Sequence, residues 1–189
     1  MGAYRMSTGK NRLKMVLEYI KGLTILGLSL TLFLTFIMSH NRIPSGSMIS
    51  TINIGDHIIV NNLPYYYRAP RKGEIVVFHK GKELWVKRLI GYPGDEIDIR
   101  QGNVYVNGVR LDESDYLSNE GSSTPIIQPG ATPITFPIIV PEGTYFFMGD
   151  NRLGSLDCRF QEVGTIPVDD VVGKAWIKIY PFNQIGILH

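Results

Sequence analysis

The chain has 189 residues, of which 44% are hydrophobic and 19% charged, as in one folded domain with an appendage. Its formal net charge is +2, but residues 1–21 hold five basic side chains and one acid, so the remainder has 14 basic and 16 acidic residues. This near-neutral remainder offers no basic surface for nucleic acid. The single cysteine, Cys158, excludes an intrachain disulfide and a cysteine-based zinc cluster.

The first predicted element is a transmembrane helix over residues 22–39, "GLTILGLSLTLFLTFIMS", which holds no charge. At 1.5 Å per residue its length is about 27 Å, close to the roughly 30 Å of a hydrocarbon core. A cleaved signal peptide is the competing interpretation, but its apolar region is usually shorter, roughly 7–15 residues, and ends in a small-residue cleavage site. A buried core helix is disfavoured, because the only polar residues in the run are small Ser and Thr.

Basic residues crowd before this segment, in residues 1–21, whereas only His40 and Arg42 follow it closely. The positive-inside rule therefore predicts that residues 1–21 are cytoplasmic and that residues 40–189 form an extracytoplasmic domain. We expect a single-pass protein of the cell (plasma) membrane, with the lipid membrane as one of its partners.

After residue 50 the sequence consists of short segments rich in β-branched and aromatic residues, bounded by Gly, Pro, Asn or Asp. The fold class expected from this pattern is mostly β, with antiparallel sheets that are packed or form a partly closed barrel, preceded by one transmembrane helix. Residues 112–133 are polar and are predicted to be an exposed excursion from the domain. The predicted strands lie within residues 56–62, 73–80, 83–91, 95–99, 103–108, 134–141, 143–150 and 171–182.

Lys87 interrupts an apolar predicted strand, "ELWVKRLIG", so that one of Lys87 or Arg88 must point among apolar neighbours. Burial of a lysine amine lowers its pKa, and only the neutral amine can accept a proton from a serine hydroxyl. Serines that such a base could activate lie in "RIPSGSMIST", residues 42–51. A lysine that extends into solvent from an edge strand is the alternative.

A polar loop, "FFMGDNRLGSLDCRF", follows a predicted strand at residues 146–160. Its polar groups can hydrogen-bond locally and hold a tight turn. The pattern does not continue into a calcium-binding loop, so we predict neither a metal nor a cofactor. A Ser-His-Asp triad is disfavoured, since the sequence has no Gly-x-Ser-x-Gly elbow and no histidine in a turn built around it. Cys158 shows no mark of an exposed thiolate.

With these features in order, the chain resembles the type I signal peptidases, the membrane-anchored Ser–Lys proteases that remove signal peptides from exported preproteins. One motif alone would be a weak signal, but five in order behind an anchor are specific. The similar motifs are "PSGSM" at 44–48, "IGDHIIVN" at 54–61, "GEIVVF" at 73–78, "VKRLIGYPGD" at 86–95 and "MGDNRLGSLDCR" at 148–159.

The resemblance implies a role for each matching residue. Ser47 would be the nucleophile and Lys87 its general base. The hydroxyl of Ser45 and the backbone N–H of Ser47 would form the oxyanion hole, and Ser155 would orient the lysine amine. The other implied positions are support of the polar loop by Asp150, Asp157 and Arg159, and a substrate pocket with Ile43, Pro44 and Val86 as candidate wall residues.

The resemblance also implies partners: preprotein signal peptides as substrates and the protein-export machinery as a further partner, without nucleic acid. Two alternatives stay open, a processing peptidase with a narrow clientele and a non-catalytic anchored scaffold, either of them serving pilus or conjugation assembly. Ser50 stands where the family usually has Pro, and Leu153 stands where it has a polar residue. These departures keep the narrow peptidase open, whereas the presence of both Ser47 and Lys87 disfavours the scaffold.

Overall fold

The structure is a computed structural model that describes residues 3–117, 122–126 and 129–189. The chain divides into two compact units, Met1–Met38 and Ser39–His189. The predicted excursion at 112–133 therefore lies partly outside the described residues.

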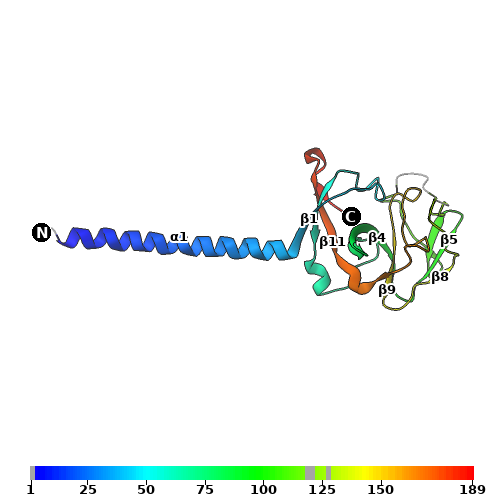
Figure 1. Ribbon diagram of the computed structural model, residues 1–189, viewed down its shortest axis with the longest axis horizontal. Coiled ribbons are helices and arrows are strands. Elements are labelled where there is room, and N and C mark those ends of the chain that lie inside the picture. Colours follow the sequence, from blue (N-terminus) through cyan, green and yellow to red (C-terminus); the bar gives the residue numbers. More distant parts are fainter. Residues whose placement is uncertain (1–2, 118–121, 127–128) are drawn as a thin grey trace. The chain divides into compact units, whose positions relative to one another are not determined.

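The first unit is a single helix, α1 (Ala3–Ile37), drawn in blue in Figure 1. Its segment Asn11–Thr35 is long and apolar enough to cross a membrane. The helix begins well before the predicted span at 22–39, since the preceding residues include good helix formers such as Leu, Lys and Met. It ends two residues before that span does, because Met38 and Ser39 begin strand β1.

The second unit contains two sheets whose described pairings are antiparallel, which confirms the mostly β fold class. Neither sheet closes on itself within the described residues. The larger sheet has the order β1-β2-β11-β3-β4-β9-β10, with β12 also paired to β11. Its strands are β1 (Met38–Arg42), β2 (His57–Asn61), β3 (Ile75–Lys80), β4 (Glu83–Gly91), β9 (Thr144–Met148), β10 (Ile166–Pro167), β11 (Val171–Tyr180) and β12 (Gly186–Ile187).

The smaller sheet has the order β7-β6-β5-β8, and Figure 1 shows β5 and β8 side by side. The predicted Asn-Gly turn joins β6 to β7, and both of its residues have positive φ, +54° at Asn107 and +78° at Gly108, as in a tight hairpin turn. The sheet's strands are β5 (Glu96–Arg100), β6 (Asn103–Val106), β7 (Val109–Arg110) and β8 (Ile138–Ile139); three short 3-10 helices of the domain span Leu63–Tyr66, Val168–Asp170 and Phe182–Gln184.

Strand β3 separates two hydrophobic cores. Val76 and Phe78 belong to the larger core, whereas Ile75 and Val77 belong to the smaller one. This division follows from the alternation of side chains along a strand. Since β4 pairs with β3 in register, with Lys87 opposite Val76, Lys87 is on the face of the larger core. The register between β3 and β4 therefore places the Lys87 side chain on the face of the larger core.

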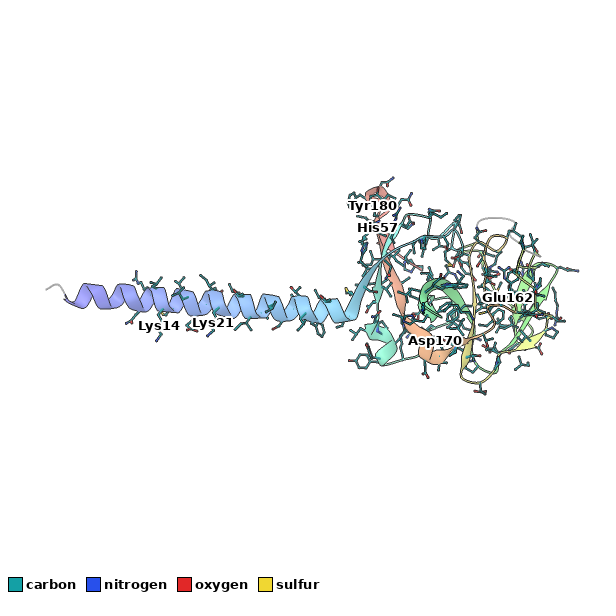
Figure 2. All side chains as sticks on the ribbon, viewed as in Figure 1. Lys14, Lys21, His57, Glu162, Asp170 and Tyr180 are labelled. Atoms are coloured by element: carbon teal, nitrogen blue, oxygen red, sulfur yellow. The ribbon has the colours of Figure 1, made fainter. Side chains whose placement is uncertain are left out.

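Strand β2 is held against β11 at its first residue. His57 pairs with Tyr180, and their ring centroids are 5.2 Å apart (Figure 2). Two side chains of β2, Ile58 and Val60, are fully buried in the smaller core. The strand that follows the serine-containing turn is thus fixed in the sheet.

Candidate active site

Ser47 lies in a short turn between β1 and β2. The turn contains a hydrogen bond from the Ile52 N–H to the Met48 carbonyl, 2.8 Å long. The side chains of Met48 and Ile52 are 2% and 0% exposed and pack in the smaller core. These apolar anchors fix the turn, while Ser45 stays exposed and Ser47 is half-buried.

The polar loop after β9 holds the same turn from another side. The Asn151 N–H donates to the Ser47 carbonyl at 3.0 Å, and the Asn151 side chain donates to the Gly46 carbonyl at 2.9 Å. Gly149 permits this close approach. A Cβ atom at that position would lie 2.2 Å from Ser155 Oγ and 2.4 Å from the Ser47 carbonyl oxygen, so no side chain fits there.

Lys87 lies in the interior strand β4 and is 4% exposed. Its Nζ donates to Ser47 Oγ at 2.7 Å and to the Val86 carbonyl at 3.2 Å. Burial lowers the pKa of Lys87 from 10.5 to about 8, against the opposing charge of Asp157. A lysine with that pKa is neutral in about a tenth of molecules at pH 7. The solvent-exposed alternative for Lys87 is therefore excluded.

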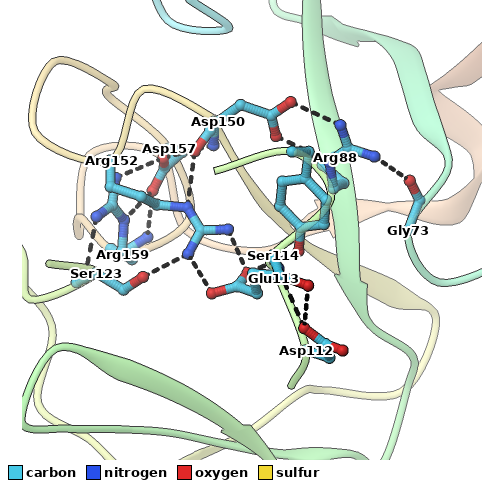
Figure 3. Close-up of polar contacts among 12 residues, drawn as sticks. Gly73, Arg88, Asp112, Glu113, Ser114, Ser123, Asp150, Arg152, Asp157 and Arg159 are labelled. Atoms are coloured by element: carbon cyan, nitrogen blue, oxygen red, sulfur yellow. Dashed lines mark hydrogen bonds and ion pairs between the residues drawn. The ribbon is translucent and has the colours of Figure 1, made fainter. Parts of the chain in front are cut away.

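Arg88, the next residue, is on the opposite face of β4 and is also buried, at 2% exposed. Its guanidinium makes two hydrogen bonds with the Asp150 carboxylate, 2.8 and 2.6 Å long, and donates to the Gly73 carbonyl at 2.6 Å (Figure 3). The Thr51 hydroxyl donates to the same carboxylate at 2.5 Å. Asp150 therefore joins β4, the polar loop and the turn that carries Ser47.

Asp157 and Arg159 form a second ion pair with no side-chain exposure. Two hydrogen bonds of 2.8 Å join them, and the Gly149 N–H donates to Asp157 at 2.9 Å. Burial alone would raise the pKa of the Asp157 carboxyl, but the charge and hydrogen bonds of Arg159 outweigh it and hold that pKa below its ordinary value. The pair thus fixes the backbone at Gly149, beside the serine turn.

Ser155 is fully buried next to Gly149. Its hydroxyl lies close enough to Asp157 to help lower the pKa of that carboxyl, yet it makes no hydrogen bond of normal geometry with a described residue. The structure therefore brings Ser155 to the site without a hydrogen bond to Lys87. Its role in orienting the lysine stays a prediction.

Arg152 and Glu113 form a third pair that the sequence analysis missed. The Arg152 guanidinium donates to the Glu113 carboxylate at 2.9 and 2.5 Å and to the Gly149 carbonyl at 2.9 Å, and it also contacts the Ser123 hydroxyl (Figure 3). Ser123 is fully buried, although it belongs to the segment predicted to be exposed. Arg152 stands in a quoted motif, but no sequence signal connects it with an acid 39 positions earlier.

A cavity of about 580 Å³ opens beside Ser47 and Lys87. Strand β4 lines it where pairing with β9 has not yet begun, since that pairing starts at Arg88. The three residues predicted as pocket walls all line this cavity, as does Ser45. Its lining comprises Ile43, Pro44, Ser45, Gly46, Ser47, Met48, Glu83, Leu84, Trp85, Val86, Lys87, Gly154 and Leu156.

Two hydrogen-bond donors at this cavity are free. Neither the exposed hydroxyl of Ser45 nor the backbone N–H of Ser47 donates to another group in the described part of the chain. A developing negative charge on a bound carbonyl oxygen is the kind of group that such donors stabilise.

Other nucleophile and base pairs do not form here. No histidine lines the cavity, and His40 contacts His57 instead, at 2.9 Å between ring nitrogens. Burial raises the pKa of the Cys158 thiol to about 12, so it is not a thiolate at neutral pH. Among residues 3–117, 122–126 and 129–189, no group of three or more His, Cys, Asp and Glu side chains is placed to hold a metal ion.

Comparison with known proteins gives a consistent result. Residues 16–180 match the family described as "Signal peptidase, peptidase S26". The chain is 38% identical over 162 residues to "Probable signal peptidase I-2" of Synechocystis, which covers 82% of this chain and 68% of that one. It is 33% identical to "Signal peptidase I T" of Bacillus subtilis, over 94% of this chain and 92% of the relative.

Among solved structures, a crystal structure of a signal peptidase I from Enterococcus faecalis is similar at 28% sequence identity and a TM-score of 0.43. That similarity covers 57% of this chain and 97% of the other.

The buried pair of Asp157 and Arg159 gives a test of stability. Arg159→Met is expected to lower the free energy of unfolding by about 3–5 kcal/mol, because it leaves the buried carboxylate without its cation. The measurement is guanidinium unfolding of the full chain in detergent, followed by circular dichroism. In the control Arg100→Met, the removed guanidinium is 57% exposed in its pair with Asp98, so the expected loss is much smaller. Equal losses in both variants would contradict the assignment.

Proposed function

Because the chain belongs to the signal peptidase family, peptidase S26, we propose that it is a signal peptidase I that cleaves preproteins with a dyad of Ser47 and Lys87. One observation carries the proposal of the dyad: a buried lysine amine lies 2.7 Å from a serine hydroxyl at the wall of a cavity. A nucleophile next to a base whose pKa is near the working pH is the arrangement that acyl transfer requires.

In the first half of the proposed reaction, the neutral Lys87 amine accepts the proton of the Ser47 hydroxyl. The Ser47 oxygen attacks the carbonyl carbon of the residue before the cut, forming a C–O bond. The carbonyl oxygen becomes an oxyanion, which accepts hydrogen bonds from the Ser45 hydroxyl and the Ser47 N–H.

In the second half, the protonated Lys87 gives its proton to the leaving amine as the C–N bond breaks. This leaves an acyl group on Ser47 and a neutral lysine. Lys87 then takes a proton from water, whose oxygen attacks the acyl carbon, and the C–O bond to Ser47 breaks. The serine regains its proton from the lysine, so both residues return to their starting states.

The proposed substrate is an extended peptide with small residues one and three positions before the cut, as the family prefers. Residues 83–87 of β4, which pair with no second strand among the described residues, support this, because an extended chain can add to a free strand edge through backbone hydrogen bonds. Apolar walls from Ile43 and Val86 suit small side chains and do not select charged ones.

We further propose that α1 anchors the protein in the cell membrane, with residues 1–21 cytoplasmic and the β domain outside. The apolar length of α1 and the basic residues at its start support this orientation. Nine residues separate Ile37 from Ser47, so the anchor would keep the serine near a membrane that also holds the substrate's apolar segment. The proposed partners are the lipid membrane and the export machinery.

The site gives separate observations on the two alternative functions, the anchored scaffold and the processing peptidase with a narrow clientele. An anchored scaffold needs no desolvated lysine beside a serine, so the contact at Ser47 supports an enzyme. At Ser50 the backbone has φ of +91°, which proline cannot adopt, and its hydroxyl donates to the Tyr116 carbonyl at 2.9 Å. Ser50, which replaces the family's proline, therefore belongs to a turn of different backbone conformation. It does not line the cavity beside Ser47 and Lys87.

Cleavage of a preprotein carrying an Ala-x-Ala signal peptide tests the function directly. The full chain in detergent and lipid should cut after the second Ala, and Ser47→Ala should remove cleavage. Ser45→Ala should lower the rate about 10²–10³-fold, as loss of an oxyanion donor does. Product mass identifies the cut bond. If Ser47→Ala cuts as fast as the unchanged protein, the proposed nucleophile is wrong; a panel of preproteins separates broad from narrow specificity.

The pH dependence tests the base. Because the lowered pKa of Lys87 is about 8, activity should rise with pH through that value as the amine loses its proton. Lys87→Arg should abolish cleavage at every pH, since a guanidinium stays protonated. The rate is measured between pH 6 and pH 10 with a fluorogenic peptide. A flat profile, or an active Lys87→Arg variant, would refute the assignment.

The close approach at Gly149 tests the positioning of the site. Gly149→Ala should lower the rate about 10²-fold or more, because the methyl group must displace Ser155 or the Ser47 carbonyl. Gly186→Ala is the matched control, since a Cβ there meets no atom within 4 Å. Circular dichroism verifies that both variants fold. Full activity in a folded Gly149→Ala variant would show that the two loops are not tightly coupled.

A further inference from the structure

Trp85 lies beside the lysine amine on the same face of β4. Residues 85 and 87 are two apart, so their side chains share a face. The Lys87 Nζ is 5.2 Å from the centroid of the Trp85 ring, and both residues line the cavity. Trp85 is half-buried and packs on the larger core next to Phe78, its neighbour in register on β3. The indole and the amine therefore lie side by side at the wall of the cavity.

Glu83 holds the indole in this position. The Trp85 Nε1–H donates to the Glu83 carboxylate at 2.9 Å, and Glu83, two residues earlier, is on the same face of β4. Glu83 itself is exposed and lines the cavity. This segment of β4 pairs with β3 alone among the described strands. Side-chain contacts such as the one between Glu83 and Trp85 therefore help to hold it in place, as a second neighbouring strand would.

The charged groups around Lys87 lie on other elements. The polar loop contributes Asp150, Asp157, Cys158 and Arg159, of which the two carboxylates favour the protonated amine and Arg159 disfavours it. A ring face also favours an ammonium. Burial acts in the opposite direction and prevails, so the groups that keep water from the amine set its protonation state.

We propose that Glu83 and Trp85 are a positioning pair for the base of the proposed Ser–Lys reaction: the carboxylate fixes the indole, and the indole closes the cavity side of Lys87 against water. This inference rests on the proposed function for its catalytic meaning. The physical arrangement, a tryptophan that excludes water from a lysine, stands independently of any cleavage.

The arrangement is tested without a substrate by using Trp85 as its own probe. The chain has two tryptophans, so Trp176→Phe leaves Trp85 as the sole indole. The emission of Trp85 in the full chain should change with pH in one step near pH 8, as the neighbouring amine loses its proton. In Trp176→Phe/Lys87→Met the step should vanish. A step that persists without Lys87, or no step at all, would overturn the contact.

The pH profile of cleavage then tests positioning. Trp85→Ala should move the midpoint upward by about 1 pH unit, a fraction of the 3–5 that full burial can produce, and so lower the rate at pH 7 about tenfold. The rate should recover toward that of the unchanged protein at pH 9 to 10. Trp85→Phe, which keeps a ring, should keep the midpoint and shows that the site tolerates substitution. Trp176→Ala, a half-buried tryptophan on β11, is the matched control for loss of an indole.

Glu83 is tested by two variants. Glu83→Gln keeps an acceptor for the indole N–H and should keep the midpoint, whereas Glu83→Ala should move it upward by less than Trp85→Ala does. If Trp85→Ala lowers the rate equally at every pH, the indole is only a substrate wall and the proposal fails. If the protein cleaves no preprotein but the emission step depends on Lys87, the proposed function fails while the water-excluding contact stands.

Discussion

The structure depends on keeping one lysine amine out of water, which lowers the pKa of that amine. Lys87 is on an interior strand against the larger core, and its burial disfavours the ammonium form. Carboxylates nearby would restore that charge if they were unpaired. Asp150 and Asp157 are each paired with an arginine at hydrogen-bond distance, and the charge of Arg159 opposes their effect on the amine. The lowered pKa of Lys87 and the buried ion pairs are therefore parts of one electrostatic arrangement.

Those ion pairs also shape the backbone. Three arginines of this region, one on β4 and two on the polar loop, hold two carboxylates of that loop and one of the segment after β7 (Figure 3). Burying charges is costly, and apolar groups of the same size can give equal stability. Paired charges add geometric specificity, because a planar guanidinium hydrogen-bonds to a carboxylate in only a few orientations. Gly149 shows the result, since Arg152 binds its carbonyl, Asp157 accepts its N–H, and the Ser47 carbonyl lies beside it.

Local patterns predicted the longer strands of the domain and the Asn107–Gly108 turn, because side-chain alternation and positive φ are properties of a few adjacent residues. They missed β1 and the two-residue strands β7, β10 and β12. The resemblance pointed to Ser47 and Lys87, which lie 2.7 Å apart. The partners of Arg88 and Arg152 were not predictable, since pairs separated by 62 and 39 positions depend on how the chain folds back. Trp85 was read only as an apolar strand residue, because its contact with the lysine needs the face that register selects. The start of α1 was missed, because residues 1–21 were interpreted by their basic charge and not by the helix formers among them.

The free edge of β4 has a consequence for the protein in its resting state. A strand with unpaired N–H and C=O groups beside apolar walls is a template for any extended chain, including another molecule of the same protein. Here that edge is only five residues long, from Glu83 to Lys87, and it begins at the exposed, charged side chain of Glu83. Such brevity and charge are the usual protection against edge-to-edge aggregation. The edge that we propose as a peptide-binding strand is therefore too short, and too polar at Glu83, to pair readily with a neighbouring sheet.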